Sequence, residues 1–154
     1  MKGPSALLAD TVACRCEVYP REHPHDSKRR YICRKKKIQF GFHDKKIEIS
    51  VKKFSGIGNF TSGLMFLSRK KAKALLFEFK KPERFSITSL FVFFPFIALW
   101  LDDKNNVIEM KIVKPFTWHI PSRKPYCRLL EIPFNDKYKD ILEILVGGKH
   151  LKRI

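Results

Sequence analysis

One apolar stretch constrains the fold of this chain more than any other feature. It runs from Ile87 to Leu101 with the sequence ITSLFVFFPFIALWL, and it is rich in aromatic and β-branched residues. Such residues favour buried strands over a solvent-facing helix. Pro95 interrupts the run, and because proline has no backbone N–H it belongs at a strand end or a bulge. We therefore predict a buried strand, a kink and a second buried strand, with a polar turn and a half-buried strand following over 102–113.

The same stretch is too short to cross a membrane as a helix. It spans about 15 residues and contains Thr88, Ser89 and Pro95, whereas a spanning helix needs roughly 20 mostly apolar residues. The brief apolar segment near the start of the chain is interrupted by Asp10, so no signal peptide is visible. We expect a cytoplasmic protein in which the apolar stretch forms the core.

Shorter signals on either side of this stretch also predict strands. Residues 47–51 alternate between apolar and polar, and the apolar patterns at 75–79 and 128–133 are typical of further strands. Two segments favour helix instead. Ser68 is a reasonable N-cap for one or two helical turns that reach Ala74, and residues 136–145 suit a short helix.

Several short strands with little helix predict a mainly β domain, built as a β-sandwich or a barrel-like sheet. We place this globular domain at residues 38–154, which is long enough to bury a core. Residues 1–37 differ, because they hold three of the four cysteines and three of the nine prolines but few periodic apolar positions. We expect them to form a basic N-terminal extension.

Charge is the most unusual part of the composition. The chain has 32 Lys and Arg residues against 15 Asp and Glu residues, a net charge of +17. The surfaces of thermophilic proteins balance many lysines with glutamates, and that balance is missing here. Residues 41–154 alone hold 22 basic and 11 acidic residues, so the predicted domain is basic as well. A large uncompensated positive field indicates a polyanionic partner.

Two clusters concentrate this charge. The first, KRRYICRKKK over residues 28–37, interleaves an aromatic ring with basic side chains, which suits phosphate contacts combined with stacking on a base. A solvated charge run or a lipid-surface patch are the alternatives. The second cluster lies in the segment after Ser68. The predicted nucleic-acid-binding residues are Lys28, Arg29, Arg30, Tyr31, Arg34, Lys35, Lys36, Lys37, Arg69, Lys70, Lys71 and Lys73.

Several short sequence motifs, in a fixed order along the chain, resemble those of a known family. The set comprises Gly63-Leu64-Met65-Phe66, the strand and turn from Leu99 to Asp103, Val107-Ile108-Glu109, Lys114-Pro115 and Leu130-Glu131-Ile132. It is similar to domain of unknown function family 192, also called uncharacterised protein family 0127, and closer to its short archaeal members, over roughly residues 45–150.

The resemblance implies a compact, mainly β, jelly-roll-like domain with no established activity. Many bacterial members are exported and carry a Phe-Trp-Met-Lys-Asn-Thr word before the central strands. This chain has Ile87-Thr88-Ser89-Leu90-Phe91-Val92 at that place. It therefore lacks the polar Lys and Asn of that word, and pocket chemistry inferred from those members does not carry over.

The remaining chemical signals are weak. Cys14-x-Cys16 with His23, His25 and Cys33 is an incomplete match to a zinc site, since such sites usually show two closely spaced ligand pairs. A disulfide and unpaired thiols are the other interpretations, and we assign no metal.

Catalytic candidates are equally poor. Cys127 and His119 form a nucleophile–base pair only if the fold brings them together, and a core thiol with a surface histidine is the simpler interpretation. Asp102 and Asp103 are typical of a turn. Gly56-Ile57-Gly58 lacks the further glycine and lysine of a phosphate-binding loop. We assign no catalytic residue and no cofactor.

The sequence therefore predicts a non-enzymatic protein that binds structured RNA, with a ribosomal particle as a candidate partner. Shape and phosphate contacts would dominate, because no base-reading motif is present. Two alternatives stay open. One is a small enzyme or small-ligand-binding β-domain with a concave site. The other is attachment to an anionic membrane surface through the basic segment and exposed phenylalanines.

Overall fold

The computed structural model describes residues 35–55 and 63–147. The strands in this part are β1 (Lys35–Phe42), β2 (Lys45–Ser55), β3 (Leu75–Glu83), β4 (Phe96–Leu101), β5 (Val107–Val113) and β6 (Tyr126–Pro133). A short 3-10 helix, η2 (Asp136–Tyr138), leads into the helix α1 (Lys139–Val146). The predicted mainly β class is confirmed, and so is the short helix near the end of the chain.

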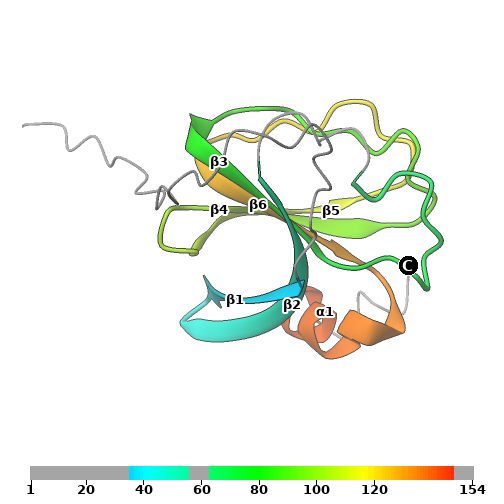
Figure 1. Ribbon diagram of the computed structural model, residues 1–154, viewed down its shortest axis with the longest axis horizontal. Coiled ribbons are helices and arrows are strands. Elements are labelled where there is room, and N and C mark those ends of the chain that lie inside the picture. Colours follow the sequence, from blue (N-terminus) through cyan, green and yellow to red (C-terminus); the bar gives the residue numbers. More distant parts are fainter. Residues whose placement is uncertain (1–34, 56–62, 148–154) are drawn as a thin grey trace, which may run out of the picture.

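The described strands form a single sheet in the order β1-β2-β3-β6-β4-β5 (Figure 1). β2 and β3 run parallel, and the other neighbouring strands are antiparallel. The two edges approach each other, because the Gly41 N–H donates a hydrogen bond to Asn105 O at 2.9 Å. A Cβ atom at Gly41 would lie 2.8 Å from Asn106 Oδ1, so a larger residue there would require the Asn106 side chain to move. The sheet is therefore curled toward a barrel.

Curling gives the sheet two apolar layers. The inner layer joins side chains of β1, β2, β4 and β6 to Leu142 and Leu145 of α1. The outer layer joins Phe77, Phe96 and Trp100 to side chains from the loops over residues 63–74, 84–95 and 114–125. Successive side chains of a strand point to opposite faces, and both faces are covered. All six residues of β4 are buried for this reason.

Two local predictions were wrong. Residues 88–95 form no strand, and only an isolated bridge joins Ile87 to Ile120 in this part of the chain. The backbone pairs instead with the 114–120 loop, so that β4 begins after Pro95. The segment after Ser68 is a turn and not a helix, because Ala74 is drawn into the sheet: its N–H bonds to Tyr138 Oη at 2.8 Å, and its carbonyl accepts from Lys52 N at 2.8 Å.

The predicted extension over 1–37 lies mostly outside the described residues and stays a prediction. Its last residues, 35–37, belong to β1. Among the described residues, no helix has the length and apolar character needed to span a membrane.

Candidate functional site

The first predicted cluster is described only at its end. Lys36 and Lys37 are exposed on the edge strand β1. Lys37 forms an ion pair with Glu48 at 2.8 Å, and this hydrogen bond raises the pKa of Lys37 and lowers that of Glu48. The predicted residues Lys28, Arg29, Arg30, Tyr31 and Arg34, together with the side chain of Lys35, lie outside the described residues.

The second cluster lies on a braced turn. The Arg69 guanidinium donates to the carbonyl of Phe134. Asn135 Nδ2 donates to the carbonyls of Arg69 and Ala72, each at 3.0 Å. These bonds hold the turn against the start of η2.

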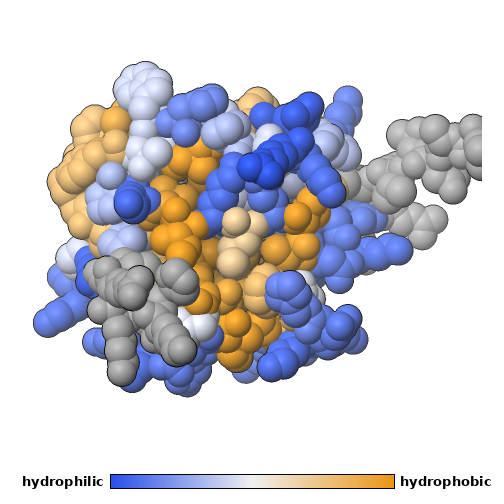
Figure 2. Space-filling view, turned by 180° about the vertical axis from the view of Figure 1, so that it is seen from behind, coloured by the Kyte–Doolittle hydropathy of each residue, from blue (hydrophilic) through white to orange (hydrophobic). Residues whose placement is uncertain are grey.

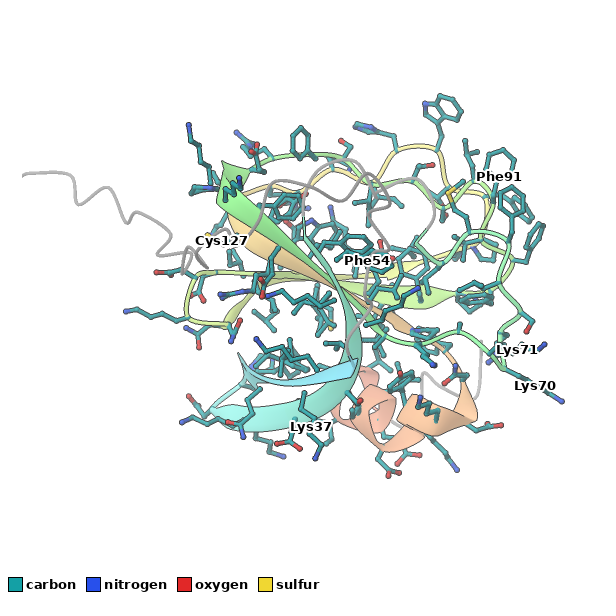
Figure 3. All side chains as sticks on the ribbon, viewed as in Figure 1. Lys37, Phe54, Lys70, Lys71, Phe91 and Cys127 are labelled. Carbon is teal, nitrogen blue, oxygen red and sulfur yellow. The ribbon has the colours of Figure 1, made fainter. Side chains whose placement is uncertain are left out.

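The three lysines of this turn, Lys70, Lys71 and Lys73, are exposed and form no ion pair with any described residue. In Figure 3, Lys70 and Lys71 lie along the same edge of the molecule as Phe91, whereas Lys37 lies apart under β1 and β2. The described ends of the two predicted clusters are therefore not brought together.

Four phenylalanines form a cluster beside this turn, and the sequence reasoning, which expected exposed phenylalanines, did not identify these residues or their clustering. Phe66, Phe91, Phe93 and Phe116 leave 46–70% of their surface exposed. The Phe66 and Phe91 rings stack with centroids 5.1 Å apart, and Phe93 meets Phe116 edge-on at 5.5 Å. Phe66 also lies 6.5 Å from Phe93. We call these four residues the aromatic cluster. Figure 2 shows apolar side chains reaching the surface at this end of the molecule, which lies on its left.

The backbone of the aromatic cluster is unusual. Phe66 and Phe116 both have a φ of 58°, a left-handed conformation that is a genuine outlier for a bulky side chain. Strain of this kind costs on the order of 1–3 kcal/mol and is often kept at functional sites. Both of these residues leave more than half of their surface exposed.

Ser89 fixes the loops that carry three of these rings. Its hydroxyl is fully buried, donates to Lys114 O at 2.7 Å and accepts from Thr117 N at 2.9 Å. Its backbone carbonyl accepts from Phe116 N at 3.0 Å. The Phe66 N–H donates to Phe91 O at 3.0 Å, which ties the third loop to the same unit. The aromatic cluster is therefore held by backbone bonds and is not a set of loose loop tips.

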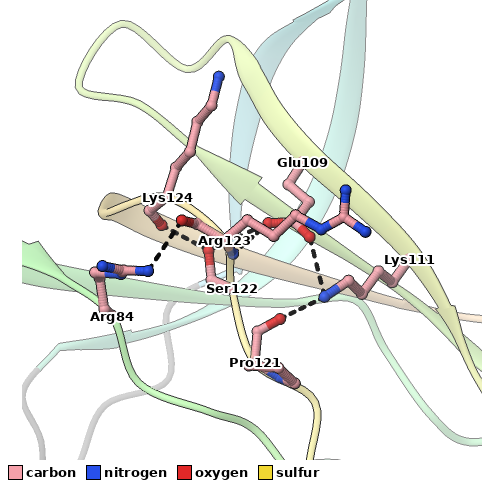
Figure 4. Close-up of polar contacts among 7 residues, drawn as sticks. All are labelled: Arg84, Glu109, Lys111, Pro121, Ser122, Arg123 and Lys124. Carbon is pink, nitrogen blue, oxygen red and sulfur yellow. Dashed lines mark hydrogen bonds and ion pairs between the residues drawn. The ribbon is translucent and has the colours of Figure 1, made fainter.

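A second brace holds the far end of the 114–125 loop (Figure 4). Glu109 accepts from Arg123 N at 2.8 Å and pairs with Lys111 Nζ at 3.0 Å. Burial alone would raise the pKa of Glu109, but the bond from Arg123 N–H and the Lys111 charge outweigh it and lower that pKa. Ser122 Oγ adds a bond to the carbonyl of Lys124 at 2.6 Å.

A separate basic groove lies between the β1–β2 hairpin and the β4–β5 turn. It has a volume of about 430 Å³, and Lys45, Lys46 and Lys104 line it together with Asp44. Positive charge is therefore distributed over several faces of the described structure, and the 69–73 turn is the basic segment that continues directly from the aromatic cluster.

The weaker sequence candidates have structural explanations. Cys127 is buried on β6 and disulfide-bonded, so its sulfur is no thiolate nucleophile, and His119 is exposed. Asp102 caps its own turn, as predicted, by accepting from Lys104 N and Asn106 N, each at 2.8 Å.

No group of acidic, His or Cys side chains in the described ranges has the geometry of a metal site. The candidate ligands Cys14, Cys16, His23, His25 and Cys33 fall outside those ranges.

Fold and surface together define a small curled-sheet β-domain that exposes an aromatic cluster beside exposed lysines. The chain belongs to domain of unknown function family 192, described as "Uncharacterized ACR, COG1430", whose model matches residues 42–144. The resemblance inferred from the ordered motifs is thereby confirmed. No curated relative matches the chain.

Two solved structures share the fold. One is a proposed transcription regulator from Sinorhizobium meliloti 1021, with a TM-score of 0.56 and 16% identity, covering 67% of this chain and 81% of that one. The other is a protein of unknown function from Novosphingobium aromaticivorans DSM 12444, with a TM-score of 0.55 and 14% identity, covering 68% and 76%. At these identities the likeness shows the fold alone.

Proposed function

We propose that this protein is a non-enzymatic binding protein for RNA, and that the aromatic cluster and the lysine turn after Ser68 form its contact surface. The observation that carries the proposal is the direct continuity of exposed rings with exposed lysines that form no ion pair within the described ranges. In the segment from Phe66 to Lys73, an exposed ring is followed within a few residues by three exposed lysines.

The chemistry of such a surface matches nucleic acid. Lysines bind phosphates with an affinity that falls as the salt concentration rises. Exposed aromatic rings stack on unpaired bases, such as those in RNA loops and bulges. The rigid support of the rings by Ser89 favours binding, because little side-chain and loop ordering remains to be done. A ribosomal particle in the cytoplasm is the partner that we favour.

The net charge of +17 supplies the long-range part of the attraction. This net charge does not distinguish one basic face from another. The proposal is therefore tested by comparing two variants that have the same net charge but lose lysines from different faces. The chain offers two sets of three exposed lysines: Lys70, Lys71 and Lys73 on the turn, and Lys45, Lys46 and Lys104 along the basic groove.

The experiment is a salt titration of RNA binding by three proteins. The full chain, a K70Q/K71Q/K73Q variant and a K45Q/K46Q/K104Q control are titrated with a structured RNA between low and moderate salt. Each phosphate contact contributes about 0.7–0.9 to the slope of log K against log salt, so we expect the loss of three lysines in the turn variant to flatten the slope by roughly 2–3. The control variant has the same net charge and should keep most of the slope. Equal losses in both variants would show non-specific attraction and would refute the assigned surface.

A second candidate function is attachment to an anionic membrane surface. The specific observation in its favour is the apolar character of the cluster, since four phenylalanine rings expose little that can accept or donate a hydrogen bond. Aromatic side chains with adjacent lysines also suit the headgroup region of anionic lipid. Sedimentation with vesicles of phosphatidylserine and phosphatidylcholine separates the two. Binding to vesicles but not to RNA, lost in the turn variant, would replace RNA by lipid as the partner.

A further inference from the structure

An apolar cavity that is partly open to the surface lies under the loops of the aromatic cluster and has no role in the function proposed above. Its volume is about 360 Å³. Leu64, Met65, Ile87, Val92 and Phe96 supply most of its walls, and Ser86 and Thr88 add two hydroxyl groups. Cavities of this size and lining are typical of sites for small molecules.

One acidic side chain, Glu131, lies among these mainly apolar walls. Glu131 lies on the central strand β6, opposite Leu75 of β3 and Ala98 of β4, and its side chain faces the cavity. Only 8% of the residue is exposed. Its carboxyl forms no hydrogen bond or ion pair with any residue in the described ranges. The carboxyl is thus held among apolar side chains and faces the cavity, where a bound molecule can supply its hydrogen bonds.

The fold brings two of the short sequence motifs that carry the family resemblance together at this carboxyl group. Gly63 begins the first motif, and Leu130-Glu131-Ile132 is the last. A Cβ atom at Gly63 would lie 3.6 Å from Glu131 Oε2 and 3.3 Å from both Leu75 Cδ1 and Phe77 Cζ. A side chain at position 63 would therefore crowd the space in front of the carboxyl, and glycine keeps that space open.

We propose that this cavity is a binding site for a small, mainly apolar, uncharged molecule with an amide-like head, and that Glu131 binds that head. A neutral carboxyl group offers one donor and one acceptor, and an amide offers the complementary pair. The alkyl part of the ligand would replace water along Leu64, Ile87 and Val92.

The protonation state of Glu131 decides between an uncharged ligand and a cation. Burial raises the pKa of Glu131 to about 8, so the carboxyl is mostly neutral near pH 7. A neutral carboxyl hydrogen-bonds an uncharged head, whereas an ammonium group would require a buried ion pair whose desolvation is expensive. The positive charge of the whole chain also opposes a cationic ligand.

Hexanamide is the probe, and chemical shifts of the wild-type chain are followed as it is added. We expect saturable shifts at Leu64, Ile87 and Val92 at pH 6. Because the neutral carboxyl is the binding form, affinity should fall about tenfold by pH 9. Glu131→Gln keeps a donor and an acceptor, so this variant should bind hexanamide with no pH dependence. Glu131→Leu should lose at least tenfold in affinity, and Glu143→Gln, which changes an exposed acid on α1, should behave like wild type.

Three results would overturn the proposal. Shifts that do not saturate, or that lie outside the cavity lining, would mean that the cavity does not bind hexanamide. Equal affinity in wild type and Glu131→Leu would remove the carboxyl from recognition. If the cavity binds hexylammonium and not hexanamide, and the affinity for hexylammonium rises with pH, the site prefers cations. A melting curve for each variant confirms that it is folded. RNA binding by Glu131→Gln should be unchanged, so the two proposals fail separately.

Discussion

Replacing Glu131 by glutamine should change how the stability of the domain depends on pH. Burial raises the pKa of this carboxyl from 4.5 to about 8 in the folded chain. Between these two values the unfolded chain has released the proton and the folded chain has kept it. The stability associated with the protonated carboxyl is therefore fully present below pH 4.5 and is lost as the pH rises toward and through 8.

The size of this effect follows from the width of the interval. One pKa unit corresponds to about 1.4 kcal/mol, so between pH 5 and pH 7 Glu131 should lower the free energy of unfolding by roughly 2–3 kcal/mol. That is a large part of the 5–15 kcal/mol that is typical of native domains. A chain of this length changes its melting temperature by about 2–4 °C per kcal/mol. Wild type should therefore lose roughly 5–10 °C relative to Glu131→Gln over the same interval.

Urea unfolding of wild type, Glu131→Gln and Glu143→Gln at pH 5, 6 and 7 measures this directly. The comparison uses the change in each variant with pH, so a constant effect of the substitution on packing cancels. We expect the wild-type and Glu143→Gln curves to decline together while Glu131→Gln stays nearly level. Parallel declines in all three proteins would show that Glu131 is ionised in the folded chain, which would refute the assignment of a neutral buried carboxyl.

Three further predictions concern the aromatic cluster and its supports. Ser89→Ala leaves the Lys114 carbonyl and the Thr117 N–H without the hydroxyl as hydrogen-bond partner, so the free energy of unfolding in urea should fall by about 1–3 kcal/mol. A decrease below about 0.5 kcal/mol would contradict the structural role of Ser89. Phe93→Ser should weaken RNA binding about tenfold, since stacking contributes roughly 1–3 kcal/mol per base, and equal affinity would remove this ring from the interface. Glu109→Gln should lower the free energy of unfolding above pH 4.5, because the ionised Glu109 stabilises the folded chain there. The difference from wild type should disappear as the pH falls through the lowered pKa of Glu109 in the folded chain, which denaturation of both proteins at pH 3–6 measures.

The sheet was largely predictable because its strands carry regular local patterns. The alternation at 47–51 lies in a strand, as do the second half of the apolar run, which ends at Leu101, and the segment ending at Pro133. The order of the strands and the curl of the sheet were not predictable in the same way. They depend on contacts between distant residues, such as the Gly41–Asn105 bond.

The loops show where local patterns mislead. The run from Ile87 to Phe94 has the composition of a strand, but Ser89 bonds to the 114–117 loop and bends the chain away from the sheet. A signal was present, because Phe91 and Phe93 alternate with the buried Val92 and Phe94. The sequence alone does not separate this segment from β4, which is apolar at every position and buries both of its faces.

The candidate sites were predicted unevenly for a physical reason. The lysines after Ser68 were visible as a charge cluster, since charge is a local property of sequence. Glu131 was visible only as part of a family motif. Its burial, its lack of a partner and its position beside Gly63 arise when β6 is placed between β3 and β4.

Cross-linking of a bound RNA by ultraviolet light, followed by identification of the modified peptides, tests the central claim most directly. Cross-links should concentrate in the three segments that carry the exposed rings and lysines, namely 64–73, 90–94 and 114–118. They should disappear from these segments in K70Q/K71Q/K73Q and persist in K45Q/K46Q/K104Q. Cross-links confined to the basic groove around Lys45 and Lys104, with none at the aromatic cluster, would contradict the assigned surface.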